Sequence, residues 1–572
     1  MQKNEEYPPL PPPNKNNIQD TYPEQITKFA FQLTRKTPEA LQNLSKQFTY
    51  LLISLKNDLF VSDDAIEIQK YLDYFILLHK LIIYTRDIFV GKGERDLTYM
   101  MLYTLYTQFP ILAINTLKKI VKEEDNIKYP YGSWKDIKYF CNYVKEHSQL
   151  HEKDPLIETC IYILNQQFIN DLYNHNQANS FVAKWIPREK SKKFGWLYQK
   201  CVVQWSQIMY PDYYYLDASG STTNTNTIEK NPTIKFQNKI KREYRKNISA
   251  LNRSINTVQI KQCENKWSEI KFNHVSVNTL QKQWNLFLNQ DMYGYIRKQN
   301  EDRNLCRENI ISYTFYNDKN TDICKIPSSF QMEDLIKDVG NIYTIEYTER
   351  INTCWDKVKS NILQNTENII PILDLTTLNY RNALSISIML SEISKLKNKI
   401  LVYDQISTWV NLSETSSIFE KIDFVQNIKN STNIEKSNIF STLELLMLSI
   451  INTNLKEEDV GNLVLCFVSD FVTPIQDLQL QMQYFFYKNG YNITPYIIYW
   501  NVSLTTNIYY PSSAFTPRTL MLSGTSSSTF QFLQEPNWKN CTPYTYLSNI
   551  LGQARYNTIE KFFLGLTMGE EL

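Results

Sequence analysis

The chain has 572 residues, which is too long for one hydrophobic core, so two or three domains are expected. Hydrophobic residues make up 42% and charged residues 21%, the balance of a soluble globular protein. Glycine is scarce at 13 residues, whereas tyrosine and phenylalanine number 39 and 28, which favours packed helices over an enzyme built on glycine-rich loops. The formal net charge is only +2, so any affinity for nucleic acid has to come from local basic clusters.

Cysteine and histidine spacing argues against a structural zinc site. No two of the nine cysteines stand at Cys-x-x-Cys spacing, and the five histidines are not expected to form a zinc helix, although His147 and His151 have His-x-x-x-His spacing. We therefore expect reduced thiols in a reducing, cytoplasmic compartment. No secretory signal is visible, and no apolar run reaches the ~18 residues that a membrane helix needs. Residues 1–21 are polar and proline-rich, which predicts a disordered tail.

Between residues 22 and 365 the chain has the pattern of packed helices. Apolar residues recur every three or four positions in the segments 26–41, 48–55, 65–85, 97–107, 111–121 and 134–144. Short joints containing glycine or proline separate them, which predicts an all-α, HEAT-like helical-repeat region. Because no clean sequence period is visible, an irregular helical bundle is the alternative. A polar stretch near 218–233 is predicted to be a flexible insert, and the structure of 291–324 is left open.

Residues 366–540 have the pattern of a Rossmann-like α/β domain. Short apolar runs typical of buried parallel strands alternate with helix-like segments, and they lie at 369–374, 399–404, 463–468, 494–500 and 519–522. This alternation predicts a parallel sheet covered by helices on both faces, followed by a C-terminal helical extension at 541–572. In such folds ligands bind at the carboxyl ends of the strands.

Oxygen-bearing side chains stand at those strand ends. Asp374 and Thr376 follow the first strand, Thr432 lies in a later polar loop, and Asp470 follows a central strand. Together they could hold a hard divalent cation such as Mg²⁺, which prefers oxygen ligands. The alternative is that the two aspartates cap helices and bind backbone N–H groups.

This order of residues resembles the metal-ion-dependent adhesion site of a von Willebrand factor A domain. That site usually reads Asp-x-Ser-x-Ser, with a Thr and an Asp from later loops. In this chain Leu378 stands at the second hydroxyl position and offers no side-chain oxygen. The resemblance therefore implies a degenerate site of low occupancy at Asp374, Thr376, Thr432 and Asp470. We expect no cofactor, with weakly bound Mg²⁺ as the alternative.

Further motifs resemble an uncharacterised family of plants, bacteria and giant viruses that is related to the Ro (TROVE) ribonucleoproteins. The motifs are Gly91-Lys92-Gly93-Glu94-Arg95, Tyr131-Gly132-Ser133-Trp134-Lys135-Asp136, Ala183-Lys184-Trp185-Ile186-Pro187 and Lys266-Trp267-Ser268-Glu269-Ile270. The resemblance spans roughly residues 82–533 and implies a helical-repeat ring followed by a von Willebrand A domain. In Ro-like relatives the ring binds single-stranded RNA ends in its hole and structured RNA on its outer face. The Asn-, Ile- and Lys-rich composition would suit a giant virus, with the protein in the host cytoplasm or the virion.

Two basic clusters are the predicted RNA-binding residues. The first contains Lys184, Arg188, Lys190, Lys192 and Lys193, and the second contains Lys235, Lys239, Arg242, Arg245 and Lys246. Basic residues on one helix face can follow a row of phosphates. Nearby Trp185 and Trp196 could stack unpaired bases, although both are more typical of core anchors, and a basic helix face is often only solvated. The pairs Arg86-Asp87 and Lys135-Asp136 are expected to be ion pairs or caps.

No motif supports catalysis. The chain has neither a Gly-x-x-x-x-Gly-Lys-(Ser/Thr) phosphate loop nor a Gly-x-Ser-x-Gly elbow. We predict a non-enzymatic, RNA-binding or ribonucleoprotein-like scaffold, whose partners are single-stranded or structured RNA and a protein bound through the von Willebrand A-like domain. The alternative is a protein-interaction or virion structural component with no RNA role. A Mg²⁺-dependent hydrolase using Asp374, Asp404 and Asp470 is a third hypothesis.

Overall fold

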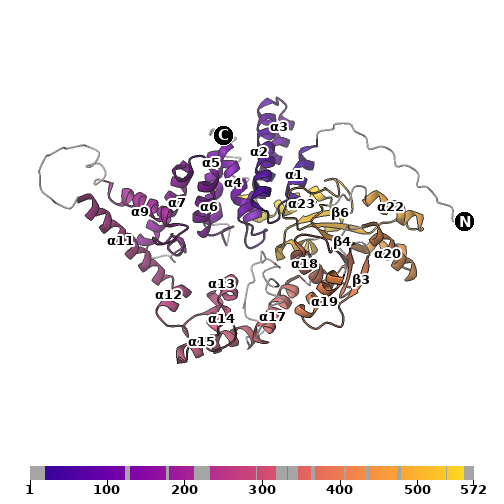
Figure 1. Ribbon diagram of the computed structural model, residues 1–572. Coiled ribbons are helices and arrows are strands. Elements are labelled where there is room, and N and C mark those ends of the chain that lie inside the picture. Colours follow the sequence, from indigo (N-terminus) through magenta and orange to yellow (C-terminus); the bar gives the residue numbers. More distant parts are fainter. Residues whose placement is uncertain are drawn as a thin grey trace.

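The computed structural model describes residues 20–122, 129–174, 180–211, 232–291, 293–316, 332, 336, 345–362, 367–404, 407–431, 439–472, 478–535 and 537–559. It is mostly helical and carries one mixed six-stranded sheet near its C-terminal end (Figure 1). A helical region followed by an α/β domain was predicted from the sequence, and this coarse organisation is confirmed. Among the described residues, no helix is both long and apolar enough to cross a bilayer.

The helical region begins with a set of helices that share one hydrophobic core. These are α1 (Tyr22–Phe31), α2 (Pro38–Val61), α3 (Ala65–Arg86), α4 (Asp96–Gln108), α5 (Pro110–Val121), α6 (Lys135–His147), α7 (Pro155–Tyr173), α8 (Val182–Trp185), α9 (Gly195–Met209) and α11 (Pro232–Ser254). Their boundaries follow local chemistry: Thr37 accepts a hydrogen bond from the Ala40 N–H, and Pro38 fills the first helical position. Asp154 caps α7 in the same way, through the Leu156 N–H.

Smaller elements follow α11 and lead back to the α/β domain. They are α12 (Val258–Cys263), α13 (Val277–Lys282), α14 (Trp284–Phe287), α15 (Glu301–Ile311), the π-helical turn η3 (Ser312–Tyr316) and α17 (Ile345–Ile362). A separate small core joins α13, α14 and α15. The Arg350 guanidinium of α17 lies 4.6 Å from the centre of the Trp284 ring, so α17 also contacts α14.

One expected helix is wrong. The apolar pattern over 26–41 predicted a single helix, but α1 ends at Phe31 and α2 begins at Pro38. The end of α1 lies at the carboxyl ends of two strands of the sheet, where the Phe31 and Ala30 carbonyls accept hydrogen bonds from Asn501 (2.7 Å) and Ser523 (2.8 Å). In the segment that follows, the Thr34 hydroxyl donates to the Ser503 carbonyl, and the Thr37 N–H donates to the Leu504 carbonyl at 3.1 Å. Tertiary hydrogen bonds therefore replace the helical ones that the local pattern favoured.

The sheet has the strand order β3-β2-β1-β4-β5-β6. Its strands are β1 (Asn368–Asp374), β2 (Lys399–Tyr403), β3 (Thr408–Asn411), β4 (Leu463–Ser469), β5 (Tyr496–Asn501) and β6 (Thr519–Ser523). All neighbours pair in parallel except β2 and β3. The edge strand β3 was not predicted, because four residues with two exposed ends give little pattern.

Helices cover both faces of the sheet, as predicted. They are α18 (Tyr380–Ile393), α19 (Ile418–Ser431), α20 (Ile439–Asn452), α21 (Glu457–Asn462), α22 (Leu478–Lys488) and α23 (Pro543–Leu551). Alternate residues of β4 enter opposite cores: Val464, Cys466 and Val468 pack with α18 and α19, while Leu465 and Phe467 pack with α20 and α22. Burial on both faces explains why this strand reads as a continuous apolar run.

The helical region is attached to the α/β domain at both of its ends. At one end Phe31 packs against Phe471 with ring centres 5.5 Å apart, and at the other α17 packs on α18 and α19. In the view of Figure 1 the helices run outward from α1 to α11 and return through α14, α15 and α17. Short 3₁₀ turns complete the structure: η1 (His151–Lys153), η2 (Phe272–His274), η4 (Ser527–Gln534), η5 (Trp538–Asn540) and η6 (Ala554–Ile559).

The C-terminal segment ties the two parts together. After α23 the chain reaches back to α3, where the Arg555 guanidinium binds Asp87 at 2.5 and 2.9 Å. The Tyr556 hydroxyl donates to the same carboxylate at 3.0 Å, and the Tyr131 hydroxyl donates to the Arg555 carbonyl at 2.6 Å. Asp87 is fully buried, so these partners satisfy a charge that would otherwise be costly to bury.

Candidate functional sites

The strand-end site lies at the carboxyl ends of β1 and β4, which are adjacent strands where the chain order reverses. Asp374 ends β1 and is buried. Its Oδ1 accepts hydrogen bonds from the Thr376 N–H at 2.9 Å and the Thr376 hydroxyl at 2.7 Å, and its Oδ2 accepts from the Ser469 hydroxyl at 2.8 Å. Such a crevice is where ligands bind in open α/β sheets. In this molecule both oxygens of the central carboxylate accept hydrogen bonds from protein donors.

Asp470 is the second carboxylate of this site. It accepts from the Leu378 N–H at 3.0 Å and the Val472 N–H at 3.4 Å. Burial raises the pKa of Asp470 above its usual range, the Leu378 N–H partly offsets this rise, and the nearby Asp374 charge adds to it. Phe471 next to it has a φ of 52°, a left-handed conformation that a bulky residue adopts only when its surroundings enforce it.

Two more side chains define the chemistry of the strand-end site. The Tyr403 hydroxyl lies beside Asp374 and Ser469, and burial, followed by the Asp374 charge, raises its pKa well above the ordinary value. Burial lowers the pKa of Lys429 on α19, while the Asp374 charge acts in the opposite direction. The Lys429 ammonium group itself lies 3.6 Å from the centre of the Tyr380 ring.

The structure brings together three of the four residues proposed as metal ligands. Asp374 and Thr376 are hydrogen-bonded to each other, Asp470 accepts from the Leu378 N–H of the same loop, and Thr432 lies outside the described residues. Leu378 contributes a backbone N–H donor rather than an oxygen, and its side chain is 75% exposed. The bonding matches the alternative stated for the two aspartates, which was that they bind backbone N–H groups at strand ends.

A second site is a basic surface built on aromatic rings in the helical region. We define the basic surface as Arg95, Lys135, Lys138, Lys184, Arg188 and Lys193. Four of these cations approach the Tyr139 ring of α6: Arg95 at 5.0 Å from its centre, Lys135 at 5.2 Å, Lys138 at 5.5 Å and Lys193 at 5.9 Å. The distances lie within the ~6 Å range of cation–π attraction.

Trp185 and Phe194 serve as further platforms for the same cations. Lys138 lies 4.9 Å from the centre of the Trp185 ring and 5.2 Å from that of Phe194. Lys135 and Lys184 lie 5.4 and 5.6 Å from the Trp185 ring. Phe194 is 8% exposed and Trp185 is half-buried, so both rings anchor the core and also present a face to the lysines.

The cations of the basic surface have no carboxylate partner within 4.0 Å in the part of the chain that the structure describes. Nearby acids are engaged elsewhere: Asp136 pairs with Arg86 at 2.8 Å, and Glu189 pairs with Arg245 at 2.8 Å. Burial, followed by the Lys135 and Arg188 charges, lowers the pKa of Lys138 to about 8. Burial also lowers the pKa of Lys135, and Arg95 and Lys282 add to that effect.

The predicted RNA-binding residues divide between this surface and the adjoining helix α11. Lys184, Arg188 and Lys193 belong to the basic surface, and Lys190 and Lys192 are exposed on the same loop. On α11, Lys239, Arg242 and Lys246 are exposed, whereas Arg245 is paired with Glu189. The side chain of Lys235 lies outside the described residues. Because Asn252 of α11 donates to the Ala183 carbonyl at 3.1 Å, the two predicted clusters are neighbours.

Sequence reasoning did not assign Arg95, Lys135 and Lys138 to an RNA-binding surface. The pairs Lys135-Asp136 and Arg86-Asp87 were expected to be ion pairs or caps: the ion pairs are wrong, but both aspartates accept local backbone N–H groups, from Ser133 at 2.7 Å and Phe89 at 3.0 Å. In the structure Arg86 and Asp136 form a buried bidentate pair at 3.0 and 2.8 Å, and the Tyr99 hydroxyl donates to Asp136 at 2.6 Å. Adjacent helix residues point in different directions, so Asp136 faces inward and Lys135 outward. The spacing of Lys135, Lys138 and Tyr139 was the available signal.

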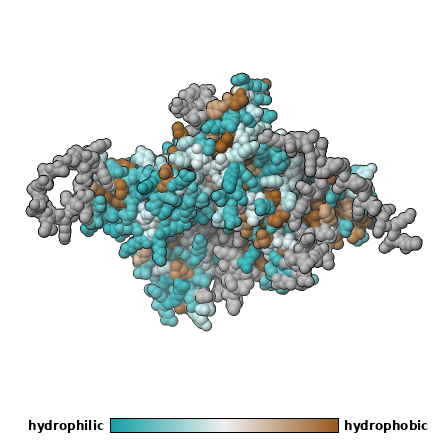
Figure 2. Space-filling model, turned by 45° about the horizontal axis from the view of Figure 1, so that its top comes forward, coloured by the Kyte–Doolittle hydropathy of each residue, from teal (hydrophilic) through white to brown (hydrophobic). Residues whose placement is uncertain are grey.

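Figure 2 shows a largely hydrophilic face on the side of α7, α9 and α11, with apolar residues at the tip of α2 and α3. That tip carries Phe60, Val61 and Ile66, which are 66%, 79% and 79% exposed.

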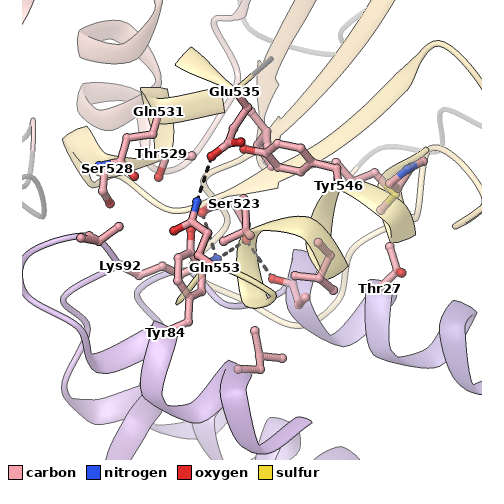
Figure 3. Close-up of a pocket in the computed structure, with 18 residues that line it drawn as sticks. Thr27, Tyr84, Lys92, Ser523, Ser528, Thr529, Gln531, Glu535, Tyr546 and Gln553 are labelled. Carbon is pink, nitrogen blue, oxygen red and sulfur yellow. Dashed lines mark hydrogen bonds between the residues drawn. The ribbon is translucent and has the colours of Figure 1, made fainter. Parts of the chain in front are cut away.

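A small cavity lies where α1 and α3 meet β6, η4 and α23 (Figure 3). Lys92 lies at its edge and donates to the Leu33 carbonyl at 2.9 Å and to the Ser523 carbonyl and hydroxyl at 3.0 and 2.5 Å. The buried hydroxyls of Thr27 and Thr529 line the same cavity and have no protein partner. Its volume of about 50 Å³ suits a few ordered waters and is too small for a cofactor.

The fold and the two sites define a class of protein: a long helical region with a basic surface, joined to a mixed α/β domain with a strand-end site whose carboxylates accept hydrogen bonds from protein donors. Residues 371–543 match the model of a protein family described as a domain of unknown function (DUF7788). The matched segment runs from within β1 to the start of α23 and leaves the helical region unmatched. Comparisons with curated proteins and with solved structures found no match.

Proposed function

We propose that the protein is a non-enzymatic, RNA-binding scaffold of the Ro-related type. In this proposal a HEAT-like helical region binds RNA, and the sheet is a von Willebrand A-like domain that supports it. The observation that carries the proposal is the basic surface, because its cations converge on shared rings and lack acidic partners in the described part of the chain. Unneutralised lysines and arginines in one place are the electrostatic footprint of a polyanion site.

The sheet order supports the domain part of the proposal. Four parallel pairs with an antiparallel edge strand give a doubly wound fold, with Asp374 and Asp470 at its switch point. The attachment of the helical region to this domain at both ends is compatible with a ring-like array closed by the α/β domain.

In this proposal the strand-end site stabilises the domain and does not hold a metal ion of the adhesion-site type. A cation needs oxygen lone pairs, but both oxygens of Asp374 accept protein hydrogen bonds, and Leu378 presents an N–H. Burial lowers the pKa of Lys429, and the Asp374 charge opposes that change. This donor set supports a structural role for the site and gives no step to a hydrolase mechanism.

The test is the salt dependence of RNA binding by the full chain. We expect a labelled 12-nucleotide oligouridylate to bind with a slope of about −3 in a plot of log affinity against log salt, since four or five phosphates each contribute about −0.7. Reversing two charges, Lys135→Glu with Lys138→Glu, should lower the affinity more than about tenfold and reduce the slope by about 1.4.

A matched control is the pair Lys46→Glu and Lys70→Glu, which makes the same change in net charge at exposed positions on α2 and α3. This variant should bind as the unmodified chain does. Affinity that does not change between low and moderate salt, or that falls equally in both variants, would contradict the proposal.

A second candidate function is docking of a protein partner on the strand-end face. The observation that favours it is the exposure of two apolar side chains beside Asp470, Leu378 at 75% and Val472 at 42%. Chemical crosslinking in cells would test it: Leu378→Ser should remove a specific protein crosslink while RNA binding persists. Loss of RNA binding in the same variant would count against two separate surfaces.

A further inference from the structure

The aromatic rings of the basic surface are already in contact with cationic side chains of the protein. Each ring is approached by at least two lysine ammonium groups, and Tyr139 is approached by three lysines and one arginine. Lys138 alone lies within 5.5 Å of three ring centres, those of Tyr139, Trp185 and Phe194. A nucleobase that stacked here would have to displace these cations from the ring faces.

The rings hold the cations together without neutralising them. A ring quadrupole attracts an ammonium group but carries no net charge, so the positive charges remain available to a ligand. A carboxylate would have attracted the lysines equally well and would have cancelled them. Arg245 shows this second arrangement on the adjoining helix, where Glu189 neutralises it.

We propose that the basic surface recognises the phosphates of a single-stranded nucleic acid backbone and that its aromatic rings position the lysines rather than stack the bases. This inference deepens the proposed RNA-binding function and rests on it. Lys135 and Lys138 are the central phosphate ligands, because they share the Tyr139 and Trp185 rings. Binding should therefore be insensitive to base identity.

The exposed cations beyond the basic surface extend the same mode of binding. Lys190 and Lys192 flank it on one side, and Lys239, Arg242 and Lys246 of α11 are exposed on the neighbouring helix. The last three lie three and four residues apart, so they share one helix face. A backbone that leaves Lys138 could continue along α11.

The first experiment compares three ligands of the full chain: a 12-nucleotide oligouridylate, an abasic sugar–phosphate oligomer of equal length, and inorganic polyphosphate as a competitor. We expect the abasic oligomer to bind within about threefold of the oligouridylate, and polyphosphate to displace both. Even one stacked base is worth enough to make the abasic oligomer about fivefold weaker, and several stacked bases would weaken it far more. A loss of about fivefold or more would overturn the inference.

The second experiment removes the cations and leaves the rings. In the double variant Lys135→Met and Lys138→Met, the Tyr139 and Trp185 faces become free for stacking. Phosphate recognition predicts that the affinity for the oligouridylate falls about tenfold, whereas base stacking predicts unchanged or tighter binding. Lys46→Met with Lys70→Met is the matched control and should bind normally.

The three ligands distinguish the failures of the two proposals. If the unmodified chain binds polyphosphate but not the oligouridylate, the RNA function is wrong, and so is the assignment of a nucleic acid backbone to the basic surface. If it binds the oligouridylate but neither the abasic oligomer nor polyphosphate, the RNA function stands and this inference is wrong. If it binds none of the three, both are wrong.

Discussion

Arg86 and Lys138 lie on adjacent helices of the same core, yet their charges are handled in opposite ways. Arg86 is buried against Asp136, and that carboxylate also accepts from the Tyr99 hydroxyl and the Ser133 N–H. Lys138 faces three aromatic rings and no acid within ion-pair distance in the described residues. A cation that is paired with an acid stabilises the fold, whereas a cation that contacts only aromatic rings remains available to bind an anionic ligand. The first should matter for stability and the second for binding.

The largest change in unfolding free energy is expected when the Arg86–Asp136 ion pair is broken. Asp136→Asn removes the counter-charge from a buried guanidinium and should cost about 3–5 kcal/mol of unfolding free energy, because a buried charge is left unpaired. Urea denaturation of the full chain measures it. Asp96→Asn, an exposed acid at the start of α4, is the control and should cost less than about 1 kcal/mol. An equal loss of unfolding free energy in Asp136→Asn and Asp96→Asn would contradict a special structural role for the buried ion pair.

Replacing Lys138 should have the opposite effect, with little change in stability and a loss of RNA affinity. Lys138→Met should leave the unfolding free energy within about 0.5 kcal/mol of the unmodified chain, because no ion pair is lost and the Lys135 and Arg188 repulsion is relieved. Its RNA affinity should fall several-fold. Denaturation and fluorescence anisotropy on the same preparation separate the two quantities. Destabilisation as large as that of Asp136→Asn would show that Lys138 is structural.

The pH dependence of RNA affinity tests whether the charge of Lys138 binds phosphate. The pKa of Lys138 is lowered to about 8, so the charged form of this lysine is disfavoured in the folded, RNA-free protein. The charge therefore destabilises the fold below pH 8, and this contribution disappears as pH rises toward 10.5, the pKa in the unfolded chain. A bound phosphate favours the charged form, so RNA affinity should fall as pH rises above 8. Lys138→Arg stays charged and should flatten the profile between pH 7 and 9.5. An identical profile in both proteins would exclude Lys138 as a phosphate ligand.

The order of strands and helices could be predicted from the sequence because each buried strand is a short apolar run followed by a helical period. Strand β3 could not, since Thr408–Asn411 buries too little to leave a pattern. The break at 32–37 was hidden because its hydrogen-bond partners, such as Ser503, are distant in the chain. For the same reason sequence spacing found Lys184 and Lys193 but missed Arg95, which reaches the Tyr139 ring only after folding.

Asp470 in the strand-end site is a buried carboxylate whose charged form is destabilised even though it accepts backbone hydrogen bonds. The folded-state pKa of Asp470 is raised, so its contribution favours the fold below the unfolded-state pKa and declines as pH rises through the folded-state pKa. At neutral pH Asp470→Asn should therefore change stability by less than about 1 kcal/mol, because the amide oxygen still accepts the Leu378 N–H and the repulsion from Asp374 is gone.

Asp374→Ala is the contrasting variant. It leaves the Thr376 N–H and the Thr376 and Ser469 hydroxyls without their acceptor and should cost about 1–3 kcal/mol. Thermal melts with and without millimolar MgCl₂ complete the test. Since the carboxylates of the site accept hydrogen bonds from protein donors, Mg²⁺ should shift the Tm of the unmodified chain and of Asp470→Asn equally. A stabilisation by Mg²⁺ that only the unmodified chain shows would mean that the carboxylates exchange these donors for a cation.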